Sequence, residues 1–210
     1  MKTLLFDLDG TLTDSAEGII NCASLALRQL GLPVPDRDEM RIFVGPPLRQ
    51  TFQKFGVSRK DAERAVEIYR SRYVPIGMFE NTPYPGIHAM LAALKQAGHR
   101  LYVATSKPES MATAILERFG MASYFEMICG ATLDDSRDSK DKVIAYLLRN
   151  AAHSDQFYMI GDTTYDVIGA AAHQIPTIGV AWGYGDPEEM LQAGATAIAR
   201  SPAHLLEMLI

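Results

Sequence analysis

Two acid-bearing segments of the chain have the residue types needed for phosphoryl transfer. The first is Asp7-Leu8-Asp9, directly after the apolar run at residues 4–6, and the second holds Asp162 and Asp166 after the apolar run at 157–160. In an open parallel sheet such strand ends converge on one edge, so these carboxylates should gather and repel one another unless a cation lies among them. An all-oxygen ligand set without His or Cys favours Mg²⁺. The four acids therefore predict a magnesium site.

The first pair of acids could also perform the chemistry. Asp7 and Asp9 are two residues apart, and Gly10 would let the chain turn away from the strand at that point. Asp7 could then attack phosphorus, while Asp9 protonates the departing oxygen and afterwards takes a proton from water. Backbone N–H groups after Asp7, at Gly10 among others, could hold the phosphoryl oxygens.

A hydroxyl and an ammonium group complete the set that phosphoryl transfer needs. Thr105 or Ser106, after the apolar run at 101–104, supplies the hydroxyl. Lys140, at the expected start of a helix, is the preferred ammonium, and Lys142 is the alternative. Lys107 is a third option that we expect to be a solvated side chain.

The elements that would position these groups alternate between apolar runs and helical patterns, which predicts an α/β fold with a parallel sheet wrapped by helices. The expected strands are Thr3–Leu8, Arg100–Thr105, Phe125–Cys129, Phe157–Ile160 and Thr177–Ala181. The expected helices between them are His88–Ala97, Pro108–Phe119, Asp141–Ala151 and Tyr165–Ala172.

Residues 15–81 break this alternation, because they show helical periodicity and no convincing strand. We expect an all-helical domain there, inserted into an α/β domain made of residues 1–14 and 82–210. Asp36–Glu39 has the pattern of a capping box, which predicts the start of the second helix of this domain. Arg49 lies in this insert and is a candidate for contact with a substrate anion, or else an ordinary surface residue.

Composition narrows the classes of partner. The 210 residues are 48% hydrophobic and carry a net charge of −5 with no basic run, which argues against nucleic acid or an anionic membrane. Cys22 and Cys129 are isolated, which argues against a zinc site or a disulfide framework. No apolar run approaches the roughly 18 residues of a membrane span. We expect a cytoplasmic protein, monomeric or homodimeric.

Taken together, these motifs resemble the haloacid dehalogenase superfamily. The segments Asp9–Ser15, Thr105–Pro108 and Val180–Gly185 are similar to its phosphoglycolate phosphatase-like subgroup. The resemblance implies a Rossmann-like core with a small helical cap after the first strand, and a bound Mg²⁺. It further implies a role for each residue of the site. Asp7 would be the nucleophile and a metal ligand, and Asp9 the general acid/base with its carbonyl on the metal. Thr105 and Lys140 would hold the phosphoryl group, Asp162 would bind the metal, and Asp166 would bind it directly or orient a metal-bound water.

The favoured reading is a Mg²⁺-dependent phosphatase acting on a small phosphorylated metabolite. A β-phosphoglucomutase-like phosphomutase shares the same core, and a receiver-like signalling module also gathers acids, a Thr and a Lys. Dehalogenases of this superfamily lack an acid at the position of Asp9, which disfavours dehalogenation. A phosphonate hydrolase would need a Schiff-base lysine, for which Lys54 and Lys60 are candidates only by default. Phosphoglycolate, nucleoside monophosphates, sugar phosphates and pyrophosphate remain open as substrates.

Overall fold

The computed structural model describes residues 1–46, 48–134, 136–151 and 156–210. These residues form two compact units. An α/β unit consists of Met1–Thr13 and Pro83–Ile210, and a helical unit consists of Asp14–Thr82.

A six-stranded sheet in the order β5-β4-β1-β6-β7-β8 forms the centre of the α/β unit. Its strands are β1 (Thr3–Phe6), β4 (Arg100–Pro108), β5 (Met127–Ala131), β6 (Phe157–Gly161), β7 (Thr177–Val180) and β8 (Ala197–Ala199). All adjacent strands pair in parallel. The expected α/β class with a parallel sheet is confirmed, and the short edge strand β8 was not foreseen.

The register of the sheet brings distant parts of the sequence to one edge. β1 lies between β4 and β6, and Phe6 is level with Val103 on one side and Ile160 on the other. Asp7 therefore leaves the sheet beside residues 104 and 161. In parallel sheets this carboxyl edge, where the strand order changes direction, is where ligands bind.

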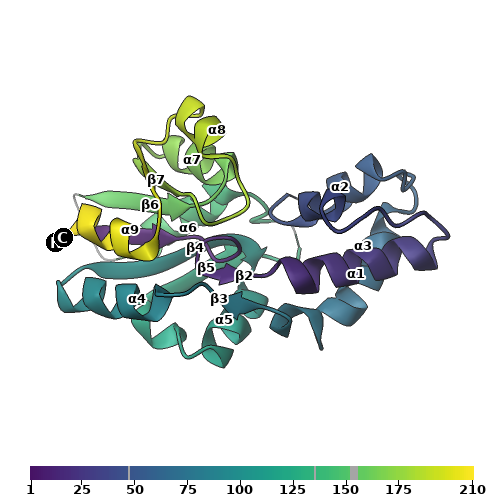
Figure 1. The fold of residues 1–210 in the computed structure, drawn as a ribbon, viewed down its shortest axis with the longest axis horizontal. Helices are drawn as coiled ribbons and strands as arrows, with labels where there is room; N and C mark the ends of the chain where they lie inside the picture. The colour runs from purple at the N-terminus through teal and green to yellow at the C-terminus, as the bar shows by residue number, and fades with distance from the viewer. Residues whose placement is uncertain (47, 135, 152–155) are drawn as a thin grey trace. The chain divides into compact units, whose positions relative to one another are not determined.

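Helices cover both faces of this sheet. They are α4 (Ile87–Gln96), α5 (Glu109–Arg118), α6 (Lys140–Asn150), α7 (Thr164–Ala171), α8 (Pro187–Gln192) and α9 (Pro202–Leu209), with a 3₁₀ helix η3 (Ala122–Tyr124). Figure 1 shows α7 on one side of the sheet and α4 on the other; α6 packs beside α7, and α9 packs beside α4. The four residues of β1 are all buried, as expected for a central parallel strand covered on both faces.

β1 ends at Phe6, two residues before the expected end at Leu8. The reason is a tight loop in which the carbonyl of Leu8 accepts N–H groups from Leu12 at 2.9 Å and Thr13 at 3.1 Å. Gly10 has a φ of 82°, a conformation that costs glycine little and other residues more. This loop turns the chain directly after Asp7.

The helical unit contains α1 (Ala16–Gln29), η1 (Glu39–Phe43), α2 (Leu48–Lys54), α3 (Ala62–Tyr73) and η2 (Gly77–Phe79). Aromatic rings form much of its core: Phe43 packs on Phe52 and Phe55, and Phe52 packs on Tyr69. The capping box expected at 36–39 does not open an α-helix. The Asp36 side chain does accept the N–H groups of residues 38 and 39, but a 3₁₀ helix follows.

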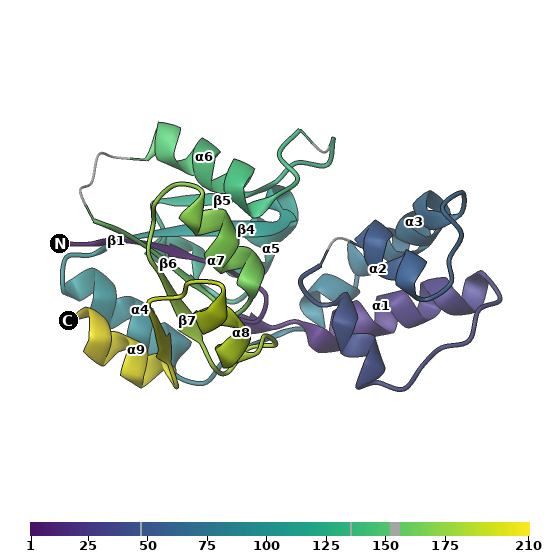
Figure 2. The same cartoon turned by 90° about the horizontal axis from the view of Figure 1, so that it is seen from above.

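The two crossings between the units are short strands, β2 (Thr13–Asp14) and β3 (Thr82–Pro83), which pair as a two-stranded sheet. Figure 2 shows α6 beside α7, and α9 beside α4, from a second direction. Within the described ranges, no helix combines the length and apolar character needed to cross a membrane.

Packing of α6 on the sheet should be a main source of stability in the α/β unit. Ile144 is fully buried in a core cluster with residues from β4, β5 and β6, so Ile144→Ala should lower the free energy of unfolding by about 2–5 kcal/mol. Ile168 on α7 is 62% exposed, so Ile168→Ala should change it by no more than about 0.5 kcal/mol. Urea unfolding of both variants measures the difference, and equal losses would contradict the assigned packing.

Candidate active site

Asp7 occupies the centre of the carboxyl edge of the sheet. Its N–H donates to the carbonyl of Ile160 at 2.9 Å, which fixes the residue against β6. Its Oδ1 accepts the N–H of Leu8 at 2.7 Å. The side chain keeps 13% of its surface exposed, so Asp7 is held firmly but can be reached from solvent.

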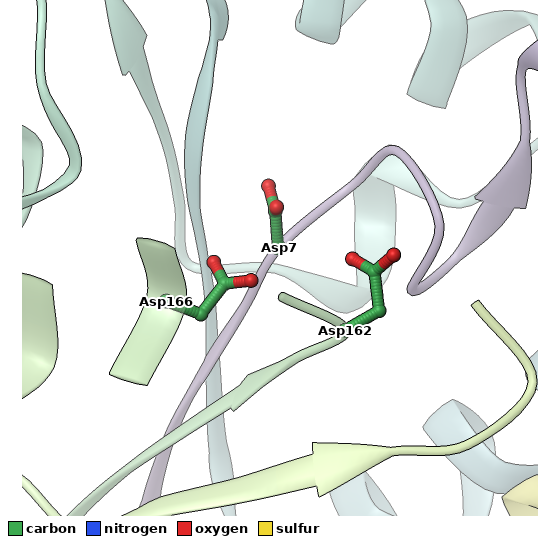
Figure 3. A group of neighbouring side chains, drawn as sticks. All are labelled: Asp7, Asp162 and Asp166. Carbon is green, nitrogen blue, oxygen red and sulfur yellow. The ribbon is translucent and has the colours of Figure 1, made fainter. Parts of the chain in front are cut away.

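Asp162 and Asp166 meet Asp7 at this edge. One carboxylate oxygen from each of the three lies within 4.8 Å of the others. Figure 3 shows Asp7 between the other two, with Asp162 and Asp166 rising from the end of β6 and the start of α7. Asp7 and two acids more than 150 residues further along the chain therefore form one group of oxygen ligands.

Asp166 is oriented by the start of its own helix. Oδ2 accepts both the N–H and the hydroxyl of Thr163, each at 3.1 Å, in a capping box at the start of α7. A carboxylate is also favoured there by the helix dipole. Oδ1 faces Lys140 at 2.8 Å. One carboxylate oxygen of Asp166 therefore caps the helix, and the other faces the site.

Asp162 is enclosed by two loops. Oδ2 accepts the N–H of Tyr184 at 2.9 Å, and the hydroxyl of Thr11 donates to Oδ1 at 3.3 Å. The 182–185 loop reaches it closely because a Cβ on Gly183 would fall 2.3 Å from the Cβ of Asp162. The indole N–H of Trp182 donates to the carbonyl of Thr11 at 3.0 Å, so this loop anchors the acid-bearing loop after β1.

Lys140 is the ammonium group of the cluster. At the first position of α6, its Nζ lies 2.9 Å from Asp7 and 2.8 Å from Asp166, and donates to the carbonyl of Ala104 at 2.9 Å. Lys142, the alternative from the sequence, lies on the exposed side of α6 and pairs with Asp138 at 2.7 Å. The geometry therefore separates the two lysines, and only Lys140 reaches Asp7.

The two candidate hydroxyl groups, those of Thr105 and Ser106, differ in burial. Thr105 is buried in β4 and hydrogen-bonds the Asp7 carboxylate. Ser106, the next residue, is half-buried. Gly10 contributes in a way other than expected, since its N–H donates to the carbonyl of Thr13 at 2.8 Å rather than pointing to a ligand. A Cβ there would fall 2.0 Å from Asp162 Oδ2, so Gly10 permits the close approach of the two acid segments.

Burial and mutual repulsion raise the pKa of two of the acids. Burial is the main reason that the pKa of Asp7 is raised, and Lys140 only partly offsets it. Burial, followed by the charges of Asp166 and Asp7, raises the pKa of Asp162 well above its ordinary value. Burial alone would lower the pKa of Lys140, but Asp166 and Asp7 more than compensate and raise it.

This electrostatic balance fits a divalent cation. One lysine stands against three carboxylates, and burial together with the neighbouring carboxylates raises the pKa values of Asp7 and Asp162. Oxygen ligands gathered in this way suit Mg²⁺, which uses few carboxylates and keeps several waters. The residues present are therefore compatible with the metal that the sequence predicted.

Asp9 has a partner that the sequence analysis misjudged. The Nζ of Lys107 donates to both carboxylate oxygens of Asp9, at 2.9 and 2.7 Å. Lys107 was expected to be solvated, but only 5% of its side chain is exposed. The error came from ending the strand at Thr105, whereas β4 runs to Pro108. Side chains two apart on a strand share a face, and this alternation was the available signal.

Arg49 lies on α2 of the helical unit. Its Nε is 2.5 Å from Glu63 Oε1 at the edge of α3, and both side chains are largely exposed. This contact explains the position of Arg49 within its own unit. A role in substrate binding stays a prediction.

Comparison with known proteins agrees with this geometry. A family model described as haloacid dehalogenase-like hydrolase matches residues 4–180. A tyrosine-protein kinase PtkA from Mycobacterium tuberculosis is 43% identical over 95% of this chain and 69% of the relative. A 5'-nucleotidase from Pseudomonas aeruginosa is 41% identical over 89% and 86%, and a phosphoglycolate phosphatase from Caulobacter vibrioides is 32% identical over 91% and 84%.

The fold comparison gives the same result. The crystal structure of a predicted phosphatase from Clostridium acetobutylicum superposes with a TM-score of 0.93 and 43% identity, covering 99% of this chain and 97% of that one. The chain belongs to the haloacid dehalogenase-like hydrolase family. The family resemblance read from the sequence, including its phosphoglycolate phosphatase relatives, is confirmed.

Lys140 should be essential for the stability of the metal-free site. Lys140→Met leaves Asp7 and Asp166 facing each other without a cation, and removing one partner of a buried ion pair costs about 3–5 kcal/mol. Raised carboxylate pKa values favour the folded state at low pH and disfavour it as pH rises, so the deficit should be larger at pH 8 than at pH 5. Urea unfolding in a chelating buffer at both pH values measures it.

Lys142→Met is the matched control, two residues further along the same helix. Lys142 and Asp138 are each about half-exposed, at 51% and 50%, and exposed pairs contribute at most about 1 kcal/mol. Equal losses in the two variants, or a deficit at Lys140 that does not depend on pH, would contradict the charge balance described above.

Proposed function

We propose that the chain is a Mg²⁺-dependent phosphoric monoester hydrolase that acts on a small phosphomonoester through an aspartyl phosphate on Asp7. The observation that carries the proposal is the convergence of Asp7, Asp162, Asp166 and Lys140 at the carboxyl edge of the sheet. Membership of the hydrolase family and the names of the relatives support the reaction class.

The metal would be held by the carboxylates of Asp7 and Asp162 and the main-chain carbonyl of Asp9, with Asp166 binding it directly or through a water molecule. When bound, it neutralises negative charge and polarises the phosphoryl group. The chain itself supplies the nucleophile, the proton transfer and further positive charge. Lys140 and Thr105 both contact Asp7, so they can orient the nucleophile and also reach oxygens of a phosphoryl group placed on it.

The reaction would proceed in two displacements. In the first, a carboxylate oxygen of Asp7 forms a bond to phosphorus, the bond from phosphorus to the ester oxygen breaks, and Asp9 gives its proton to the departing alkoxide. In the second, Asp9 takes a proton from a water molecule whose oxygen attacks the same phosphorus. The bond to Asp7 then breaks and releases inorganic phosphate. Both acids return to their starting protonation states.

Transfer to a hydroxyl group in place of water would use the same Asp7 and Asp9. That reaction is the phosphomutase alternative, and the kinase name of one relative also denotes phosphoryl transfer to a hydroxyl. Core geometry does not distinguish water from a hydroxyl acceptor, because the acceptor is selected by groups around the site. A panel of phosphorylated substrates separates transfer to water from transfer to a hydroxyl group by the products formed.

Hydrolysis should require Asp7. We expect release of inorganic phosphate from at least one of phosphoglycolate, nucleoside 5'-monophosphates, sugar phosphates or p-nitrophenyl phosphate in the presence of Mg²⁺, ranked by kcat/KM. Asp7→Asn removes the nucleophile and should lower kcat by roughly 10³-fold or more. Glu207→Gln, the same change at an exposed acid of α9, should leave kcat unchanged.

Two results of the substrate panel would contradict the proposed function. Full activity in Asp7→Asn would remove the assigned nucleophile. Isomerisation of a sugar phosphate without release of phosphate would replace the hydrolase by a phosphomutase.

Mg²⁺ should stabilise the fold, because it relieves repulsion among buried acids. Saturation at about 100 times Kd stabilises by about 2.7 kcal/mol, which corresponds to a rise in Tm of roughly 5–10 °C for a chain of this size. Protons compete for Asp7 and Asp162, whose pKa values are raised, so the rise should be smaller at pH 5 than at pH 8. Thermal unfolding at both pH values tests this. Asp162→Asn should lose most of the response, and an undiminished response would place the metal elsewhere.

A further inference from the structure

The ion pair between Lys107 and Asp9 is a feature that phosphoryl-transfer chemistry does not by itself require. Lys107 donates to both oxygens of the carboxylate, and only 5% of its side chain and 14% of that of Asp9 are exposed. Two donor contacts from one ammonium group restrict both the rotation and the direction of the carboxylate. The pair therefore holds Asp9 in one orientation.

Stability alone does not explain this pair. Taking two charges out of water costs about as much free energy as their attraction returns, so a buried ion pair is weak evidence for stabilisation. Such a pair does restrict geometry, since the side chains gain their interaction energy in only one arrangement. Its location beside the nucleophile Asp7 makes geometry the relevant property.

The backbone that carries Lys107 is itself held from two sides. The N–H of Lys107 donates to the Thr105 hydroxyl at 3.2 Å, and β5 approaches so closely that a Cβ on Gly130 would fall 2.5 Å from the Lys107 carbonyl oxygen. Arg137 links the residues on either side of this contact, because it donates to the Gly130 carbonyl at 2.7 Å and to Glu109 at 2.6 Å. Lys107 thus projects from the end of β4, where its backbone has little freedom to move.

We propose that Lys107 is a positioning residue, which fixes the carboxylate of Asp9 in the place where it exchanges protons during phosphoryl transfer. The inference rests on the proposed function, because that function assigns the proton transfer to Asp9. It gives the site two lysines with separate tasks. Lys140 orients the nucleophile Asp7, and Lys107 orients the acid/base Asp9.

Saturation kinetics of three variants test the proposal, with p-nitrophenyl phosphate and Mg²⁺ as the assay. Lys107→Met keeps the length of the side chain without its charge and should lower kcat by about tenfold or more, because small misplacements of a reacting group are costly. KM and inhibition by inorganic phosphate should change by less than about twofold. Lys107→Arg keeps two-pronged donation and should recover most of the loss. Lys95→Met, an exposed site on α4, is the control.

Two results of these assays would overturn the inference. Unchanged kcat in Lys107→Met would show that Asp9 needs no such partner. A loss confined to KM and phosphate inhibition would make Lys107 a ligand of the phosphoryl group instead.

A double-mutant comparison tests whether Lys107 acts through Asp9. In an Asp9→Asn background, adding Lys107→Met should have little further effect on the single-turnover release of p-nitrophenol, because residues that act as a unit are not additive. An equal further loss in both backgrounds would contradict action through Asp9.

A crystal structure of Lys107→Met tests the same inference without any assay. It should show the Asp9 carboxylate turned or in several orientations, and an unchanged orientation would overturn the inference. If the unaltered protein hydrolysed no ester, the proposed function would fail, and this structure would still decide the positioning role separately.

Discussion

Charge balance in a small buried volume is the constraint that shapes the whole site. Asp7, Asp162 and Asp166 bring three carboxylates together, and Asp162 and Asp166 are fully buried, so water stabilises their charges poorly. Lys140 offsets part of the repulsion, but burial and the neighbouring carboxylates still raise the pKa values of Asp7 and Asp162. The same excess of negative charge that disfavours the metal-free fold would favour the binding of a cation, as the proposed function requires. In that proposal the metal relieves a repulsion that the fold alone leaves in place.

The sheet order makes this concentration of charge possible. β1 lies between β4 and β6, so the residues that follow three central strands leave the sheet side by side. Parallel pairing alone does not bring them close enough. Glycines at positions 10 and 183 let the loops after β1 and β7 press against Asp162, where any side chain would collide. Close backbone approach is thus as necessary to the site as the acids themselves.

The relatives differ in the activities that their names state. The relatives bear the names of a kinase, a nucleotidase and a phosphoglycolate phosphatase, although they share at least 32% of their aligned residues with this chain. In the proposed mechanism, activation of phosphorus and proton transfer depend on the strand-end residues, whereas the choice of substrate and acceptor depends on what surrounds them. A family can therefore keep one phosphoryl-transfer core while its members act on different molecules.

The amino-acid sequence determined the α/β class and its strand-end acids, because apolar runs of the right length and the acids that follow them are local features. It also favoured Lys140, since the start of a helix can be read from a few residues. Local pattern did not reveal the edge strand β8, the buried state of Lys107, or the 3₁₀ form of the helix η1. Only the tertiary structure decided which lysine faces which acid and why Gly10 must be glycine. Those properties depend on distances between segments that the chain brings together only when the sheet closes.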